Sequence, residues 1–256
     1  MIFGKETELR VGEELKKQGA TRVLFVYGGS SIKKSGLYGK VVKALQDAGL
    51  PFDELPGVVP NPRVSLVRKG IALCREKGID FLLAVGGGSV IDTCKAMSFG
   101  VYYDGDVWDL ISGKVKPGDR RVPVADILTL PAAGSEESDS CVISDETTHT
   151  KTGFGSPLMR PVFSIMNPEL TYTLPVYQTA SGAADIMMHT MERYITQAKN
   201  VELSDRISEG LLVTVREAAL KALTDPRDYE ARANLMWAGS LSHNGLTGTG
   251  RINDFP

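Results

Sequence analysis

The sequence predicts an α/β fold with an N-terminal Rossmann-like parallel sheet followed by an all-helical domain. In the first half, apolar β-rich runs alternate with segments of helical apolar spacing, which is the rhythm of a parallel sheet covered on both faces. After Pro168 the pattern changes, and only long helical segments follow. We therefore expect an α/β domain over residues 1–167 and a helical domain over residues 168–256.

The individual elements follow from hydrophobic spacing and from the glycines and prolines at their ends. We expect helices in the first half over residues 8–18, 37–48, 64–77 and 90–99. We expect strands over residues 21–27, near Phe52, and over 80–85 and 122–130. No regular element would tolerate Pro60-Asn61-Pro62. Shorter strands and loops are expected over 139–166, and long helices over 176–197, 203–224 and 228–246.

Bulk composition narrows the class of protein. The formal net charge of the 256 residues is −2, so no nucleic-acid partner is expected, since such proteins usually carry a basic surplus. The three cysteines, Cys74, Cys94 and Cys141, are odd in number and widely spaced, which indicates a reducing compartment. Charged residues close to the N-terminus argue against a signal peptide. The lack of an apolar run of about 18 residues argues against a membrane span. We therefore expect a soluble, cytoplasmic protein.

A glycine run, Gly86-Gly87-Gly88-Ser89, lies between a buried strand and a helix. Bare backbone N–H groups and a helix N-terminus could hold a phosphate group there, and a Cβ would block its close approach. The run matches neither G-x-G-x-x-G nor a Walker loop, so an ordinary strand-to-helix turn stays open as the alternative. Its place at the carboxyl end of a central strand favours a ligand site.

A second glycine loop, Gly28 to Ser31, ends the first strand and is followed by Lys33 and Lys34. The corresponding loop of nucleotide-binding sheets meets the adenine ribose, where a carboxylate favours NAD. This loop has hydroxyls, backbone amides and two cations instead, which suits a 2′-phosphate. The loop therefore favours NADP(H), and a solvated lysine pair is the alternative.

Asp185 and His189 stand four residues apart in a segment that reads as helix, so they share one face. A carboxylate and an imidazole at this spacing can chelate one divalent cation. The alternative is a solvent-exposed ion pair, but the neighbouring alanines, isoleucine and methionines leave no broad polar face around the two residues. A catalytic site needs three or four ligands, and the only other histidines, His149 and His243, stand in no recognisable ligand motif.

Taken together, these segments resemble the iron-containing alcohol dehydrogenases, in particular their NADPH-dependent butanol dehydrogenase-like branch. The resemblance covers essentially the whole chain in order. It is carried by Ile2-Phe3-Gly4-Lys5, residues 27–34, Pro60-Asn61-Pro62, residues 86–92 with Lys95, residues 129–136, Asn167-Pro168, residues 171–175, and Asp185 with His189.

The resemblance implies a nucleotide-binding α/β domain, a helical metal-binding domain and roles for particular residues. It places Gly28, Gly29 and Ser31, with Lys33 beside them, at the 2′-phosphate of the adenosine, and Gly87, Gly88 and Ser89 at the pyrophosphate. Asp92, Thr129 and Lys151 would line the nicotinamide side. Asp185 and His189 would be the catalytic metal ligands, holding Fe²⁺ or Zn²⁺.

Three departures from the family pattern accompany the resemblance. Ala133 stands where the family usually has a threonine, and Ser138, taken as a further cofactor contact, stands where relatives often have an asparagine. The other two metal ligands of the family are histidines beyond the segment that resembles Asn253-Asp254-Phe255. We therefore expect the chain to be clipped at both ends, with an incomplete helical domain.

The activity implied by the resemblance is metal-dependent hydride transfer between NADP(H) and a small aldehyde or primary alcohol. Two alternatives stay open: a non-catalytic nucleotide-binding remnant with an incomplete metal site, and a dehydroquinate synthase-like lyase. The lyase ranks last, because a charged substrate calls for more basic residues than Arg193 near the metal helix. A homodimer is expected, since an incomplete helical domain would expose apolar helix faces.

Overall fold

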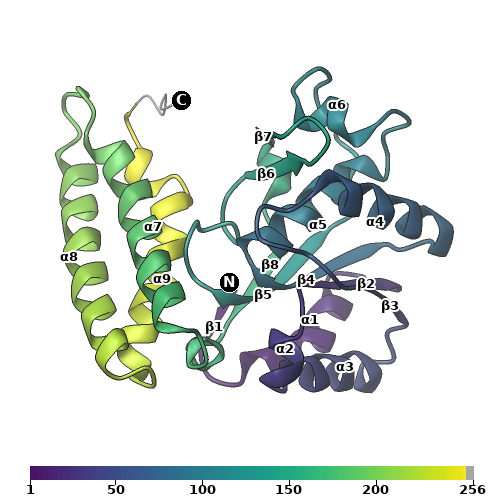
Figure 1. The fold of residues 1–256 in the computed structure, drawn as a ribbon, viewed down its shortest axis with the longest axis horizontal. Helices are drawn as coiled ribbons and strands as arrows, with labels where there is room; N and C mark the ends of the chain where they lie inside the picture. Colours follow the sequence, from purple (N-terminus) through teal and green to yellow (C-terminus); the bar gives the residue numbers. More distant parts are fainter. Residues whose placement is uncertain (252–256) are drawn as a thin grey trace. The chain divides into compact units, whose positions relative to one another are not determined.

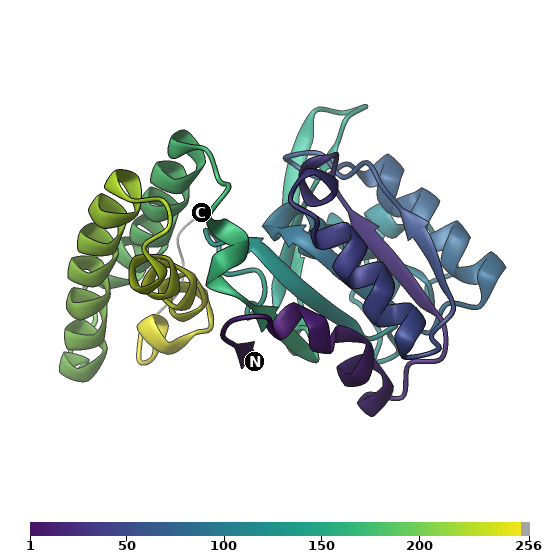
Figure 2. The same cartoon turned by 90° about the horizontal axis from the view of Figure 1, so that it is seen from below.

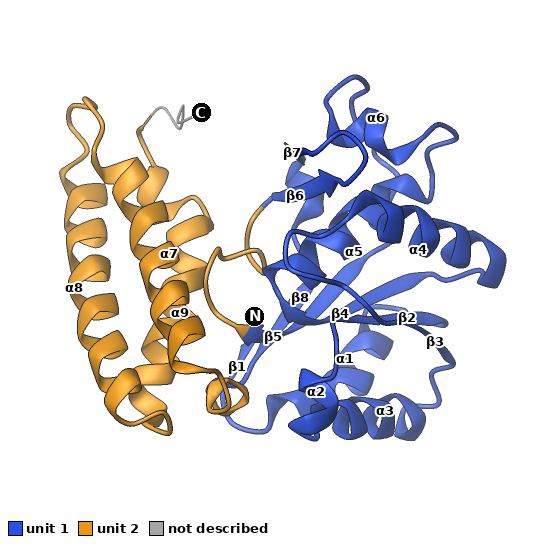
Figure 3. Cartoon of the chain, in the orientation of Figure 1, with its two compact units in different colours: residues 1–129, 139–167 blue, residues 130–138, 168–256 orange. Residues whose placement is uncertain are grey.

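The computed structural model describes residues 1–251, and the chain forms two compact units (Figure 3). The α/β unit comprises residues 1–129 and 139–167, and the helical unit comprises residues 130–138 together with the chain from residue 168 onward. The chain therefore leaves the α/β unit after Thr129, returns at Asp139, and leaves again after Asn167.

A six-stranded parallel sheet forms the centre of the α/β unit, with strand order β1-β8-β5-β4-β2-β3. The strands are β1 (Ile2–Phe3), β2 (Val23–Tyr27), β3 (Phe52–Leu55), β4 (Phe81–Gly87), β5 (Val124–Leu130) and β8 (Phe163–Met166). All residues of β2 and the first six of β4 are buried, as continuous apolar runs predict for a sheet covered on both faces. The predicted α/β fold with a parallel sheet is confirmed.

Helices cover both faces of this sheet. Helices α1 (Val11–Lys17) and α3 (Leu37–Asp47) lie on one face, and α4 (Val64–Lys77) and α5 (Gly88–Gly100) lie on the other (Figures 1 and 2). Predicted helix 8–18 begins as a 3₁₀ turn, η1 (Thr7–Arg10). The short helices α2 (Ser31–Lys34) and α6 (Val107–Ile111) and the 3₁₀ turn η2 (Pro157–Met159) complete the helices of this unit.

A separate antiparallel hairpin, β6 (Ser140–Asp145) and β7 (Thr150–Gly155), follows the chain's return to the α/β unit. Ser144 pairs with Lys151 in this hairpin. The hairpin is tied to the segment before α4, because the Ser144 N–H donates to the Pro62 carbonyl at 2.8 Å.

In the described part of the helical unit, the α-helices are α7 (Val176–Tyr194), α8 (Glu202–Thr224) and α9 (Tyr229–His243). Their shared core contains Ile186, Leu211, Val215 and Leu235, flanked by small alanines. The 3₁₀ turns η3 (Pro168–Thr171) and η4 (Leu246–Gly248) precede α7 and follow α9. Across residues 1–251, no helix combines the length and the apolar character needed to cross a membrane.

Candidate functional site

Two glycine loops and a threonine lie at the carboxyl ends of three neighbouring strands of the sheet. Gly28 and Gly29 follow β2, Gly87 and Gly88 end β4 and begin α5, and Thr129 lies near the end of β5. Because the strands are parallel, these ends share one edge of the sheet. Ligands of open α/β sheets bind at this edge.

The loop after β4 leaves the first turn of α5 open to an anion. Gly87 adopts an extended conformation (φ −91°, ψ −171°) as the N-cap of α5, with no side-chain cap and no acidic residue in the first turn. The first backbone N–H groups of a helix have no intrahelical acceptor, so they can donate to a phosphate. A Cβ at Gly86 would lie 2.4 Å from Val90 Cγ2, so the strand-to-helix turn requires glycine there.

Asp92 and Lys95 of α5 fasten this helix to the β6–β7 hairpin. Asp92 Oδ2 accepts from the Val142 N–H at 2.9 Å, and the fully buried Lys95 donates through Nζ to the Ser140 carbonyl at 2.9 Å. Between these contacts lies Cys141, and burial raises the pKa of its thiol. Asp92, expected beside the nicotinamide, therefore also holds the hairpin in place.

Lys151 of β7 reaches the Pro60-Asn61-Pro62 segment. Its Nζ donates to Asn61 Oδ1 at 2.9 Å. Asn61 has a φ of 55°, in the left-handed region that asparagine tolerates better than most residues. This hydrogen bond therefore links the segment before α4 to the hairpin that carries Lys151.

The loop after β2 brings a lysine close to two aromatic rings. Lys33 Nζ lies 5.5 Å from the ring centroid of Tyr27 and 4.9 Å from that of Tyr38, within the range of a cation–π interaction. A Cβ at Gly28 would lie 3.2 Å from the Val58 carbonyl oxygen. The loop is thus packed against the chain that follows β3, while Ser31 and Lys33 stay exposed.

Glu54 of β3 is a residue that the sequence analysis missed at this site. Its carboxylate accepts from the Tyr27 hydroxyl at 2.6 Å and from the Tyr38 hydroxyl at 2.8 Å. Burial and then this hydrogen bond raise the pKa of Tyr27 well above its ordinary value, and the bond to Glu54 raises the pKa of Tyr38. An acidic residue at the end of the strand after a glycine loop is the sequence signal that could have identified it.

Asp185 and His189 lie one turn apart on α7, as the spacing predicted. Asp185 Oδ1 is 3.7 Å from His189 Nε2, and the two side chains are 44% and 24% exposed. On the other side of the ring, Glu192 Oε2 lies 3.5 Å from His189 Nδ1. The donor types suit a divalent transition metal, although residues 1–251 contain no group of three or more such donors placed to hold one.

His243, at the end of α9, lies beside His189. The two ring centroids are 4.7 Å apart and the ring planes meet at 80°. The Arg193 guanidinium donates through one nitrogen to the carbonyls of His189 and Ser242, at 2.6 and 2.8 Å. By contrast, His149 occupies the exposed turn between β6 and β7 in the α/β unit.

Ser138, expected as a cofactor contact, belongs to the segment 130–138 of the helical unit. It is 3% exposed, and its N–H donates to the Gly134 carbonyl at 3.1 Å. In the same segment, Glu136 Oε1 accepts from the Ser240 hydroxyl at 2.7 Å. This segment is therefore fastened to α9.

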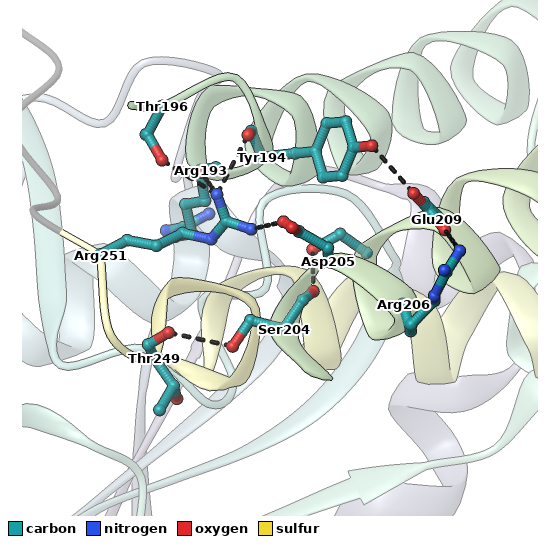
Figure 4. Close-up of polar contacts among 10 residues, drawn as sticks. Arg193, Tyr194, Thr196, Ser204, Asp205, Arg206, Glu209, Thr249 and Arg251 are labelled. Atoms are coloured by element: carbon teal, nitrogen blue, oxygen red, sulfur yellow. Dashed lines mark hydrogen bonds and ion pairs between the residues drawn. The ribbon is translucent and has the colours of Figure 1, made fainter. Parts of the chain in front are cut away.

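Arg251 binds the C-terminal end of α7 (Figure 4). Its guanidinium donates to the carbonyls of Arg193 and Tyr194 at 2.9 and 3.0 Å, and it forms an ion pair with Asp205 of α8. The Arg251 side chain is 1% exposed. Arg251 thus supplies donors to the last carbonyls of α7 and joins that helix to α8.

Comparison with protein families matches both parts of the chain. The model for iron-containing alcohol dehydrogenase matches residues 1–168, and the model for the C-terminal part of the Fe-containing alcohol dehydrogenase family matches residues 179–251. The chain belongs to the iron-containing alcohol dehydrogenase family. Within this family, the glycine loops lie in the first match, and Asp185 and His189 lie in the second.

Similar family members cover nearly all of the chain. It is 47% identical to NADH-dependent butanol dehydrogenase A of Clostridium acetobutylicum and 39% identical to NADPH-dependent aldehyde reductase YqhD of Escherichia coli, across 98% and 100% of the chain. The crystal structure of NADH-dependent butanol dehydrogenase A from Thermotoga maritima matches 98% of it with a TM-score of 0.96 at 39% identity. The chain spans 64%, 65% and 63% of the lengths of these three proteins.

Proposed function

We propose that the chain is part of a metal-dependent oxidoreductase that transfers hydride between NADP(H) and a small aldehyde or primary alcohol. The observation that carries this proposal is the pairing of Asp185 and His189 on α7, 3.7 Å apart between Oδ1 and Nε2. Membership of the iron-containing alcohol dehydrogenase family supports it, as does the open first turn of α5.

Each part of the site has a distinct task in this proposal. The N–H groups at Gly87, Gly88 and Ser89 would hold the pyrophosphate, and Asp92, Thr129, Ser138 and Lys151 would place the nicotinamide end. Asp185 and His189 would supply two ligands to Fe²⁺ or Zn²⁺, and further ligands would complete the coordination. A bound divalent cation polarises an aldehyde carbonyl and stabilises the corresponding alkoxide. The chain's own contribution is orientation of the two reactants.

The preference for NADP(H) is the finer part of the proposal. Lys33 and Lys34 supply positive charge beside Gly28, Gly29 and Ser31, and both carboxylate oxygens of Glu54 already accept tyrosine hydroxyls. Two acceptor sites of this carboxylate are thus occupied, which leaves fewer for the 2′-hydroxyl of NAD. The names of the relatives include both cofactors: butanol dehydrogenase A is described as NADH-dependent and YqhD as NADPH-dependent.

Two measurements test the activity and the cofactor. Oxidation of NADPH and NADH by the protein is followed with butanal, with Fe²⁺ or Zn²⁺ supplied and then chelated. We expect turnover that depends on metal and is faster with NADPH. Asp185→Ala should abolish turnover while leaving NADPH binding, measured by nucleotide fluorescence, unchanged. Metal-independent turnover, or loss of NADPH binding in Asp185→Ala, would contradict the assignment.

The alternative function is a nucleotide-binding chain without catalysis. It is favoured by the lack, within residues 1–251, of three donors grouped around one point. This alternative predicts NADPH binding with no turnover at any metal concentration. The lyase alternative is disfavoured further, because Arg193 donates to two backbone carbonyls instead of presenting its charge to a substrate.

We also propose a homodimer in the cytoplasm. The helical unit exposes large apolar side chains, including Tyr177 at 75%, Leu203 at 75% and Leu220 at 62%, and such surface favours association. Size-exclusion chromatography with light scattering measures the molecular mass of the protein in solution directly. A monomer at micromolar concentration would contradict the dimer.

A further inference from the structure

The two ring nitrogens of His189 each face a carboxylate on the same helix, but neither contact is short. Asp185 Oδ1 lies 3.7 Å from Nε2 and Glu192 Oε2 lies 3.5 Å from Nδ1, beyond the usual length of a strong hydrogen bond. Both carboxylates are almost half exposed, at 44% and 45%. Contacts of this length hold the plane of the imidazole only weakly.

A second imidazole supplies that restraint. The ring of His243 lies 4.7 Å from that of His189, with the planes at 80°, which is the edge-to-face arrangement that aromatic rings prefer. His189 comes from α7 and His243 from the last position of α9. Rotation of the His189 ring would break this contact.

Arg193 fixes the two histidines to each other through their backbones. One guanidinium nitrogen donates to the carbonyl of His189 and to that of Ser242, the residue before His243. The other terminal nitrogen lies 3.4 Å from His243 Nδ1. A guanidinium has donors only, so this contact, though long, favours Nδ1 as the acceptor and the proton of a neutral His243 ring on Nε2.

We infer that His243 is a positioning residue that holds the His189 ring with Nε2 toward Asp185, and that Arg193 locks His243 for this task. The inference rests on the proposed role of Asp185 and His189 as metal ligands. Neighbours that orient a metal-binding histidine typically change metal affinity by about 10- to 100-fold. His243 would thus act on the metal through His189, without any requirement that it coordinate the ion.

The first experiment reads the ring of His189 without metal. The 256 residues contain three histidines, so long-range ¹H–¹⁵N spectra of ¹⁵N-histidine-labelled protein show three ring systems, each assigned by the variant that removes it. We expect the Nε2–H tautomer for His243 and contacts between its ring protons and those of His189. His243→Ala should shift the His189 signals, and His149→Asn, the matched control in an exposed turn, should leave them in place.

The second experiment measures the Co²⁺ affinity of the protein and the visible absorption spectrum of its Co²⁺ complex. We expect about 10-fold weaker binding and an altered spectrum in His243→Ala, with partial recovery in His243→Phe, which keeps a ring but lacks the acceptor for Arg193. The metal-free variants should unfold at the same temperature as the parent within a few degrees. His243→Phe also preserves a folded comparison if the alanine variant is unstable.

The outcomes separate the two proposals. Unchanged His189 ring signals in His243→Ala would overturn the inference, as would Co²⁺ binding that matches the parent in affinity and spectrum. Lack of Co²⁺ binding by the parent protein would instead overturn the proposed metal role, and the ring signals would still decide whether His243 positions His189.

Discussion

Gly182, one turn before Asp185 on α7, should resist substitution by alanine although it lies inside a helix. Alanine normally stabilises a helix interior by about 1 kcal/mol relative to glycine. A Cβ at Gly182 would lie 2.5 Å from the Pro131 carbonyl oxygen, well inside the 3.4 Å at which ordinary contact begins. The obstacle is backbone, and such overpacking costs about 1–3 kcal/mol. We therefore expect Gly182→Ala to lower the free energy of unfolding by up to about 2 kcal/mol.

Two glycines of the same unit are matched controls for this substitution. Gly210 of α8 is exposed, with nothing within 4 Å of its added Cβ, and Gly239 of α9 has its nearest neighbours at 3.6 Å. We expect Gly210→Ala to gain up to about 1 kcal/mol and Gly239→Ala to be tolerated. Urea unfolding followed by circular dichroism at 222 nm measures all three. A Gly182→Ala protein as stable as Gly210→Ala would refute the reasoning.

Three further predictions concern other parts of the chain. Arg251→Ala should lower the free energy of unfolding in urea by about 2 kcal/mol, since charged hydrogen bonds to Asp205 and two carbonyls are lost; a change below about 0.5 kcal/mol would contradict this. Glu54→Gln should lower the pH at which Tyr38 ionises, read by absorbance at 295 nm, because removing the carboxylate's charge and weakening its hydrogen bond favours tyrosinate, and an unchanged titration would exclude the contact. Burial raises the pKa of Cys74 to about 12 and raises those of Cys94 and Cys141 well above their ordinary value, so a thiol reagent at pH 8 should count three thiols in guanidinium and almost none in the native protein; rapid native labelling would refute the burial.

The bounds of the helices could be predicted where local stop signals decide them. Helix α4 spans Val64–Lys77 as expected, because Gly78, with a φ of 65°, ends it in the left-handed conformation. Predicted helix 228–246 ends earlier, at His243, because Gly245 has a φ of 96°. The short helix α6 was missed; Asp106 caps it by accepting the Trp108 N–H, a signal too short for hydrophobic periodicity.

Some residues of the candidate site could likewise be predicted from local spacing in the sequence, and others could not because they meet only through tertiary contacts. Asp185, His189 and Glu192 share a face by their spacing on one helix, so their proximity is a local property. The neighbours Arg193 and His243 meet only because α7 packs against α9, across 50 residues of sequence. Likewise, Glu54 joins Tyr27 and Tyr38 through the pairing of β2 with β3. Spacing along one element therefore reveals part of a site, and tertiary contacts supply the rest.

Because the chain passes twice from the α/β unit to the helical unit, the parts of this protein can fold only in a certain order during synthesis. On the ribosome, residues 130–138 emerge before α7 and α9, the two helices that Pro131 and Glu136 contact. Strand β8, which lies between β1 and β5, also emerges after this segment. All strands of the sheet can therefore pair before the helices that pack against residues 130–138 have been synthesised. A gene fragment that begins at residue 168 would encode these helices without the segment that contacts Gly182 and Ser240.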